Sequence, residues 1–319
     1  MSRKKHHLAL IGARGYTGSE LLRLLVGHPG IELALAMSAS QDGLPITSEV
    51  PEWPDPAQCF TTLTPDQVAD VDADAWVLAV PNGQSAPWVA AIEAAHPDAV
   101  ILDLGADYRF DENWVYGLTE YNRPRLDGAR RIANPGCYAT GAQFGLLPIR
   151  DMLIAPPVIF GVSGYSGAGR TPNPRNDPER LADNLIPYAL AGHVHEREIS
   201  TRLGRPVRFH PHVAAFFRGI SLTIAVDLGA PVDERQLLDL YTDRYADEPL
   251  VGVSAEIPEI RTLTPPTGLQ IGGFTVDARD AGHASFVVVL DNLLKGAASQ
   301  ALQNLNRALG LDECTGMEP

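Results

Sequence analysis

The segment NPGCYATG, residues 134–141, places a cysteine where a helix is predicted to begin. Asn-Pro-Gly disfavours a helix, whereas the apolar run after Cys137 favours one. The free N–H groups at a helix N-terminus stabilise a thiolate and lower the pKa of a cysteine below its free value of about 8.5. They also bind the oxyanion that forms when a thiolate attacks a carbonyl. We therefore predict that Cys137 is a nucleophile rather than a buried structural cysteine.

A nucleophilic thiol needs an acid–base partner, and two pairs of histidines are candidates. His193 and His195 lie in GHVHEREI, at a predicted helix start, and their spacing is not the i, i+4 spacing of a zinc-binding helix. His210 and His212 lie in RFHPHVAAFFRG and form the second pair. The residues alone do not show which pair supplies the acid–base partner.

A glycine-rich segment, GARGYTG at residues 12–18, follows a predicted strand and opens a predicted helix. Gly12, Gly15 and Gly18 permit a tight turn and a close approach of backbone N–H groups to a pyrophosphate. The spacing is G-x-x-G-x-x-G, which differs from the commonest dinucleotide fingerprint. We predict a nicotinamide dinucleotide site here; the alternative is a strand-to-helix turn that binds no ligand.

The end of the second predicted strand bears on the choice of dinucleotide. Enzymes that use NAD usually place an acidic residue there for the ribose 2′-hydroxyl. This chain has Ser38 and Ser40, with no acid before Asp42. Two hydroxyls and the nearby Arg14 suit a 2′-phosphate, so we predict NADP. The alternative is that both serines are ordinary loop residues.

Apolar periodicity divides the chain near residue 137. In the first part, continuous apolar runs alternate with helical patterns, which is typical of a Rossmann-type doubly wound parallel sheet. In the second part the runs are longer and richer in strands, which indicates an α+β domain with a mixed, largely antiparallel sheet and helices on one face. Strands are predicted over 7–13, 31–37, 74–81, 99–105, 158–164, 219–228 and 283–291, and helices over 18–30, 85–97, 232–246 and 292–310.

Composition excludes several classes of function. The net charge of −14, from 25 basic and 39 acidic residues, disfavours a nucleic-acid or anionic-membrane partner. Cys59, Cys137 and Cys314 have no C-x-x-C spacing, so neither a disulfide framework nor a metal site is expected. The basic residues 1–7 precede too short an apolar run for a signal peptide, and no segment is long enough to span a membrane. We expect a cytoplasmic protein.

Several blocks together resemble the N-acetyl-γ-glutamyl-phosphate reductase family, in the branch of the fungal-type enzymes. They include GARGYTGSELLRLL, AVPNG, LDLGADYRF, ANPGCYATGAQFGLLP, GVSGYSGAGRTPNPRNDP, DNLIPYALAGHVHEREIS and DNLLKGAASQALQNLN. The resemblance implies NADPH-dependent reduction of N-acetyl-L-glutamyl 5-phosphate to N-acetyl-L-glutamate 5-semialdehyde in arginine biosynthesis, with release of phosphate. It implies a thioester on Cys137, with His195 as the acid–base and His193 as its neighbour.

The resemblance also assigns binding residues. For the substrate it implies Arg109 and Arg218 as cations, with Asn134 and Tyr138 beside the thiol. Relatives often carry arginine near position 40, where this chain has Ser40, so the departure bears on how strongly a 2′-phosphate is bound. For the cofactor it implies the turn Gly12, Arg14, Gly15, Tyr16, Thr17 and Gly18, then Pro81 and Asn82, and, near the nicotinamide, Ser163, Gly164, Ser166, Gly167, Gly169 and Asn292.

In this family the last helix packs on the cofactor domain. We therefore expect a cofactor domain of residues 1–137 completed by 292–319, and a catalytic and oligomerisation domain of 138–291. We expect a homo-oligomer, a dimer or a tetramer, and a contact with acetylglutamate kinase.

Three alternatives remain at this point. An aspartate-semialdehyde dehydrogenase would need its own cysteine context and a later G-H-S-type histidine, neither of which is found in the sequence. A cysteine hydrolase needs no dinucleotide, so the glycine turn argues against this class. A non-catalytic NADP-binding sensor would not depend on Cys137.

Overall fold

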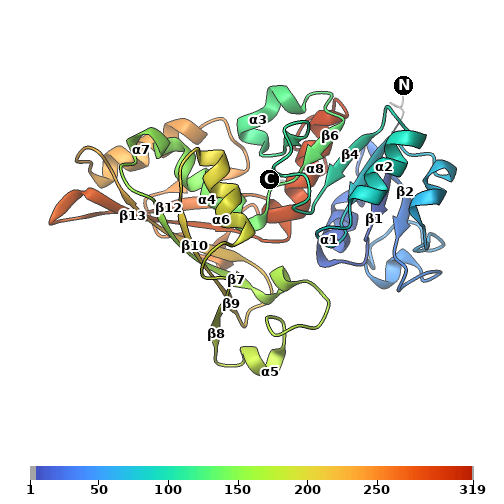
Figure 1. Ribbon diagram of the computed structural model, residues 1–319, viewed down its shortest axis with the longest axis horizontal. Coiled ribbons are helices and arrows are strands. Elements are labelled where there is room, and N and C mark those ends of the chain that lie inside the picture. Colours follow the sequence, from blue (N-terminus) through green and yellow to red (C-terminus); the bar gives the residue numbers. More distant parts are fainter. Residues whose placement is uncertain (1–4, 318–319) are drawn as a thin grey trace. The chain divides into compact units, whose positions relative to one another are not determined.

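The computed structural model describes residues 5–317, so the first four residues of the basic segment 1–7 lie outside the described chain. The chain forms two compact units (Figure 1). The first comprises the residues up to Gly136 together with those from Ala297 onward, and the second comprises Cys137–Gly296. The expected junctions, after residue 137 and before residue 292, lie near these positions.

The first unit is built on a parallel sheet of six strands in the order β2-β1-β3-β4-β6-β5. Every pairing is parallel, so the predicted doubly wound sheet is confirmed. The strands are β1 (His6–Ile11), β2 (Ile31–Met37), β3 (Ala75–Leu78), β4 (Val100–Asp103), β5 (Val115–Tyr116) and β6 (Arg131–Ala133), and the helices are α1 (Tyr16–Leu25), α2 (Ala86–Ala95), α3 (Thr119–Leu126) and α8 (Ser299–Ala308).

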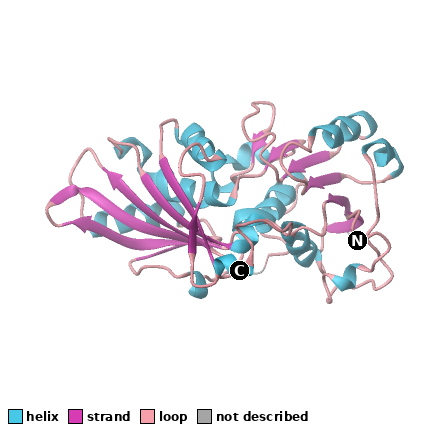
Figure 2. Ribbon diagram, turned by 60° about the horizontal axis from the view of Figure 1, so that its bottom comes forward, coloured by secondary structure: helices cyan, strands magenta, loops and turns pink. Residues whose placement is uncertain are grey.

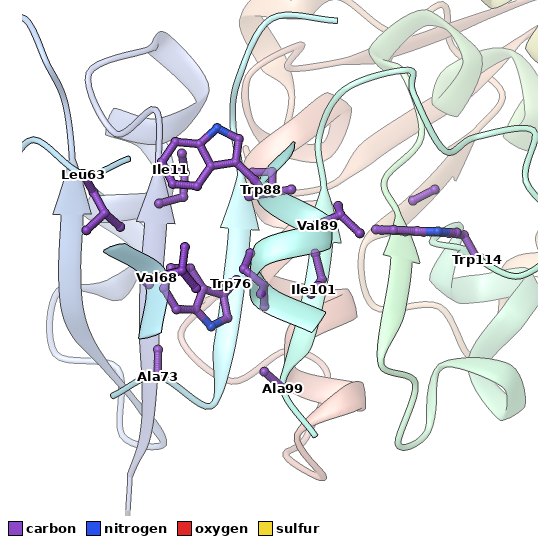
Figure 3. Packing of buried hydrophobic residues seen from close by; sticks show 14 residues of the cluster. Ile11, Leu63, Val68, Ala73, Trp76, Trp88, Val89, Ala99, Ile101 and Trp114 are labelled. Carbon is purple, nitrogen blue, oxygen red and sulfur yellow. The ribbon is translucent and has the colours of Figure 1, made fainter. Parts of the chain in front are cut away.

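An apolar cluster fills one face of this sheet (Figure 3). Trp76 of β3 is fully buried, and Trp88 and Val89 of α2 pack with it and with Ile101 of β4. All residues of β3 and β4 are buried, which explains their unbroken apolar runs. The cluster fixes the carboxyl ends of the strands, where the glycine turn lies.

The terminal helix differs from its predicted form. A single helix was expected over 292–310, but α8 begins only at Ser299, after a π-helical turn, Leu294–Ala298. The Gly296 N–H bonds to the Asp291 carbonyl, an i to i−5 bond that defines this turn. α8 packs against α1, α3 and β4 within the first unit.

The second unit is a seven-stranded mixed sheet in the order β11-β12-β13-β10-β7-β9-β8 (Figure 2). The pairs β12–β13, β13–β10, β10–β7 and β8–β9 are antiparallel, and β7–β9 and β11–β12 are parallel. The strands are β7 (Val158–Gly164), β8 (Leu185–Pro187), β9 (Arg208–Ala214), β10 (Ile220–Asp227), β11 (Val251–Ser254), β12 (Leu269–Asp277) and β13 (Asp280–Leu290), and the helices are α4 (Cys137–Leu146), α5 (Pro178–Leu181), α6 (Val194–Leu203) and α7 (Glu234–Tyr245).

Helix α4 lies directly on β10 and β13 because two glycines, four residues apart, face the sheet. A Cβ atom at Gly141 would lie 2.8 Å from side-chain carbons of Leu222 and Leu290. One at Gly145 would lie 2.7 Å from Ile224. This close packing fixes the first residue of α4, which is Cys137.

Helices α4, α6 and α7 contact the same face of the sheet, as predicted. The opposite face is open: alternate residues of β7, Val158 and Phe160, are 37% and 40% exposed. None of the helices in the described part of the chain combines the length and the apolar character that a membrane span requires.

Candidate active site

Cys137 is the first residue of α4, so the predicted cysteine at a helix N-terminus is confirmed. It is partly exposed. A Cβ atom at Gly296 would lie 2.7 Å from Cys137 Cβ, so only glycine lets the π-helical turn pass beside the thiol-bearing residue. The site therefore combines an accessible thiol with the N–H groups of the first helical turn.

Tyr138 anchors this turn of α4 to the sheet. Its ring packs edge-on against Phe209 at a centroid distance of 4.9 Å, and its hydroxyl donates to the His212 carbonyl at 2.8 Å. A Cβ atom at Gly161 would lie 2.8 Å from the Tyr138 ring, so this glycine makes room for it. Tyr138 is only 2% exposed and positions Cys137; its contact with substrate stays a prediction.

The histidines of GHVHEREI lie at the start of α6, as predicted. His193 is the N-cap residue, and its Nδ1 accepts the His195 N–H at 3.1 Å. The His195 ring lies 4.9 Å from the His193 ring and 5.9 Å from the Tyr138 ring, centroid to centroid. Glu196 fixes this helix start, because its carboxylate accepts the Phe209 N–H at 3.0 Å.

Burial lowers the pKa of His193, and the positive charge of Arg175 acts in the same direction, while Glu196 and Glu198 oppose them. The fold therefore favours neutral His193, whose unprotonated Nδ1 caps the helix. Because its pKa is lower in the folded protein, this contribution to stability is present above the ordinary histidine pKa of about 6.5 and is lost as the pH falls below it.

The second pair of histidines lies on the other face of the sheet. Along β9 the buried Phe209 points toward Tyr138, so His210 and His212, at the alternate positions, point away from it. The His212 ring packs 4.4 Å from the exposed Phe160 ring. The structure thus places His193 and His195, not His210 and His212, on the face that carries Cys137.

Two residues near the thiol were not among the predicted site residues. Tyr188 directly follows β8, and its pKa is raised to about 12, first by burial and then by the negative charge of Cys137; Arg175 opposes this. The Arg175 guanidinium lies 4.9 Å from the centroid of the Tyr188 ring. An isolated tyrosine and arginine form no recognisable spacing, so only the tertiary structure could reveal them.

The residues of the second unit that are predicted to lie near the nicotinamide form a cluster that is held by hydrogen bonds. The Asn292 side chain accepts the Gly219 N–H at 2.7 Å and donates to the Ser166 hydroxyl at 2.9 Å. The Ser163 hydroxyl donates to the Gly164 carbonyl at 2.8 Å. Gly164 and Gly167 have no room for a side chain: a Cβ atom would lie 2.5 Å from the Phe217 carbonyl oxygen at Gly164 and 2.9 Å from Ser163 Oγ at Gly167. Gly169 has a φ of +78°, in the left-handed region that favours glycine. Their role toward the cofactor remains a prediction.

Arg218 forms an ion pair with Asp291, whose other oxygen accepts the Leu293 N–H at 2.8 Å. In the first unit, Arg109 is 6% exposed and donates to the carbonyls of Asn134 and Leu104 at 2.9 and 3.0 Å. Both arginines that are predicted to bind the substrate thus also stabilise the fold through these contacts. Asn134 is 1% exposed, and its amide bonds to Ala297 and Asn304.

The glycine turn lies between β1 and α1, at the carboxyl edge of the sheet. Gly12 has a φ of +87°, and a Cβ atom added there would lie 2.3 Å from the Ala79 carbonyl oxygen. A Cβ atom added at Gly18 would lie 2.7 Å from the Ala13 carbonyl oxygen. The fold itself therefore requires these two glycines. At Gly15 a Cβ atom would meet only the Gly12 carbonyl oxygen, at 3.3 Å.

The N-terminus of α1 suits a pyrophosphate. Tyr16 and Thr17 open the helix, no side chain caps it, and its first turn contains no acidic residue. At the rim, Arg14 donates to the Ser40 hydroxyl at 3.4 Å, and both residues are exposed, whereas Ser38 is 5% exposed. Pro81 and Asn82 follow β3, and Asn82 Oδ1 accepts the Ala106 N–H at 3.0 Å. These residues fit a dinucleotide.

Gly15→Val tests the glycine turn. The φ of −54° at Gly15 is accessible to valine, so the variant should fold, at a cost of about 1 kcal/mol as an N-cap. The added side chain fills the space that a pyrophosphate needs, and NADPH affinity should fall by roughly tenfold or more. Fluorescence titration with NADPH measures this. A folded variant with wild-type affinity would contradict the assignment, and Gly15→Ala should show a smaller loss.

Comparisons with known proteins agree with this fold. Residues 7–129 match the family model described as "Semialdehyde dehydrogenase, NAD binding domain", and residues 137–292 match "Semialdehyde dehydrogenase, dimerisation domain". Among solved structures, aspartate semialdehyde dehydrogenase II from Vibrio cholerae, complexed with ASA, has a TM-score of 0.77 at 20% identity, covering 97% of this chain and 99% of that chain. The chain therefore has the fold of the semialdehyde dehydrogenase class.

Sequence identity narrows the class to one family. The N-acetyl-gamma-glutamyl-phosphate reductase of Stenotrophomonas maltophilia (strain R551-3) is 50% identical over 310 residues, 97% of each chain. That of Xylella fastidiosa (strain M23) is 49% identical over 317 residues, 99% of this chain and 96% of the relative. The chain belongs to the N-acetyl-γ-glutamyl-phosphate reductase family.

Proposed function

We propose that this protein reduces N-acetyl-L-glutamyl 5-phosphate to N-acetyl-L-glutamate 5-semialdehyde, with release of phosphate, in arginine biosynthesis. The observation that carries the proposal is the placement of Cys137 at the N-terminus of α4, on the face of the sheet where His193 and His195 begin α6. The family relationship supports the choice of substrate.

The residues of the second unit provide the covalent chemistry. The Cys137 sulfur attacks the acyl carbonyl, the bond from that carbon to the phosphate oxygen breaks, and a thioester remains. The N–H groups of the first turn of α4 hold the carbonyl oxygen while it carries negative charge. His195 accepts the thiol proton and holds it near that oxygen. When bound, the nicotinamide cofactor would supply the hydride that reduces the acyl carbon. The bond from that carbon to the Cys137 sulfur then breaks, which releases the semialdehyde and restores the thiolate.

The phosphate-dependent reverse reaction tests this function. The purified protein, with N-acetylglutamate semialdehyde, inorganic phosphate and NADP, should produce NADPH absorbance only when all three are present. Aspartate semialdehyde should be a far poorer substrate. A preference for aspartate semialdehyde would reassign the substrate, and no reduction of NADP with either aldehyde would refute the function.

We propose NADP rather than NAD, because the contact between Arg14 and Ser40 lies on the exposed rim beyond the second strand. Arg14→Gln should weaken NADPH binding by roughly tenfold, since a hydrogen bond to a charged group contributes about 1.5 kcal/mol. NADH binding should barely change, because NADH has no 2′-phosphate. Parallel titrations of both cofactors measure the difference. Equal losses for NADPH and NADH would show that Arg14 does not bind the 2′-phosphate.

We further propose that the open face of the seven-stranded sheet binds a second copy of the chain. The matching family model is described as a dimerisation domain, and Val158 and Phe160 expose apolar surface on this face. The contact with acetylglutamate kinase and the cytoplasmic location remain predictions.

A further inference from the structure

Arg175 lies in a loop, residues 169–176, whose backbone is fixed by two asparagines. The Asn173 carbonyl oxygen Oδ1 accepts the Arg175 N–H at 3.0 Å, and Asn173 Nδ2 donates to the Thr171 carbonyl at 2.9 Å. Asn176 Nδ2 donates to the Gly169 carbonyl at 2.7 Å. The loop joins the turn after β7 to α5 and β8 (Figure 1). It therefore presents Arg175 from an ordered backbone.

The Arg175 side chain points toward the thiol-bearing site. Its guanidinium lies 4.9 Å from the centroid of the Tyr188 ring, and a cation over an aromatic face is attracted to it. The Tyr188 ring in turn lies 5.5 Å from the His193 ring. Arg175 and Cys137 both act electrostatically on the Tyr188 hydroxyl. A positive charge is thus held beside the nucleophile and its histidines.

Arg175 differs from the two arginines predicted to bind substrate. Arg218 is paired with Asp291, and Arg109 donates to backbone carbonyls. Among residues 5–317, no carboxylate forms an ion pair with Arg175, whose guanidinium contact is the Tyr188 side chain. The planar, exposed guanidinium therefore keeps donors for an incoming oxyanion.

We propose that Arg175 binds an anionic group of the substrate, its phosphoryl or carboxylate oxygens, next to Cys137, and so helps to determine specificity. This inference rests on the proposed function for the identity of the substrate. The existence of the anion site does not depend on the proposed function, because the site is defined by charge and by the geometry of Arg175, Tyr188 and His193.

Alkylation of Cys137 tests the anion site without any substrate. Iodoacetate carries a negative charge and iodoacetamide does not, so their rate ratio at Cys137 reports the local positive charge. In Arg175→Gln the ratio of iodoacetate to iodoacetamide should fall roughly fivefold. Mass spectrometry resolves Cys137 from Cys59 and Cys314, which serve as internal references. Arg180→Gln removes an equal charge from the neighbouring helix α5 and should leave the ratio unchanged.

Steady-state kinetics in the reverse direction identify the bound group. If Arg175 binds the phosphoryl group, Arg175→Gln should raise the KM for inorganic phosphate about 10- to 100-fold; if it binds the carboxylate, the KM for the semialdehyde should rise instead. Arg175→Lys should recover part of the loss, because lysine keeps the charge but not the planar fork. Unchanged KM values with an unchanged alkylation ratio would overturn the proposal. A changed ratio in a protein that does not turn over this substrate would refute the proposed function and leave the anion site standing.

Discussion

Cys137→Ser should reduce turnover on the order of 10³-fold or more while NADPH binding stays intact. A serine hydroxyl at the same helix N-terminus is a poor nucleophile without a strong base, and no thioester can form. The dinucleotide turn, Gly12–Gly18, belongs to a different compact unit from Cys137, so its affinity for NADPH should not change. Coupled absorbance assays and NADPH titration measure the two quantities separately.

The other two cysteines provide matched controls. Cys59→Ser and Cys314→Ser change two other partly exposed cysteines and should leave turnover near wild type. Residual activity of more than a few per cent of wild type (~3%) in Cys137→Ser would remove Cys137 from the role of nucleophile. If turnover is lost in one of these controls instead, another thiol is the nucleophile.

His195→Asn should lower kcat by about 10²- to 10⁴-fold, which is the typical contribution of general acid–base catalysis. The effect on the KM of the substrate should be smaller, because the imidazole acts on protons that move during the reaction. Alkylation of Cys137 near neutral pH should also slow, because a nearby imidazolium favours thiolate. Stopped-flow measurement of kcat and of the alkylation rate tests both.

Variants of two other histidines, His193 and His212, separate proton transfer from positioning. His193→Asn keeps a good N-cap acceptor for the His195 N–H and should cost little activity, whereas His193→Ala should lose about 1 kcal/mol of stability. His212→Asn changes a ring on the opposite face of the sheet and should leave kcat near wild type. If His212→Asn costs the large factor and His195→Asn does not, the acid–base lies in the HPH segment.

The residues alone were sufficient where a local pattern is strong. The apolar runs of β1, β3 and β4 indicated a parallel sheet, because such strands are buried on both faces. Strand β2 lies at the edge of the sheet and exposes Glu32 and Ala34. The change from Asn-Pro-Gly to an apolar run located the start of α4 at Cys137. The glycine turn after β1 was equally clear. Each of these signals lies within about 15 residues of sequence.

Local pattern did not decide the features that depend on distant partners. The π-helical turn before α8 arises where Gly296 passes beside Cys137, and residues 137 and 296 meet only in the folded chain. Gly15 looks like Gly12 and Gly18 in the sequence. The structure separates them, because atoms of Ala79 and Ala13 lie too close for a Cβ atom at Gly12 and Gly18, whereas only the Gly12 carbonyl oxygen lies near one at Gly15.

The choice between the two histidine pairs also required the tertiary structure. Both pairs read H-x-H, and nothing in their spacing distinguishes them. The parallel pairing of β7 with β9 turns Phe209 toward Tyr138, and the alternation of side chains along a strand then sends His210 and His212 to the open face. Helix α6 brings His195 to the other face, and the loop before α5 brings Arg175 to Tyr188. The sequence determined which residue types were present for the chemistry, and the pairing of strands decided which of them meet.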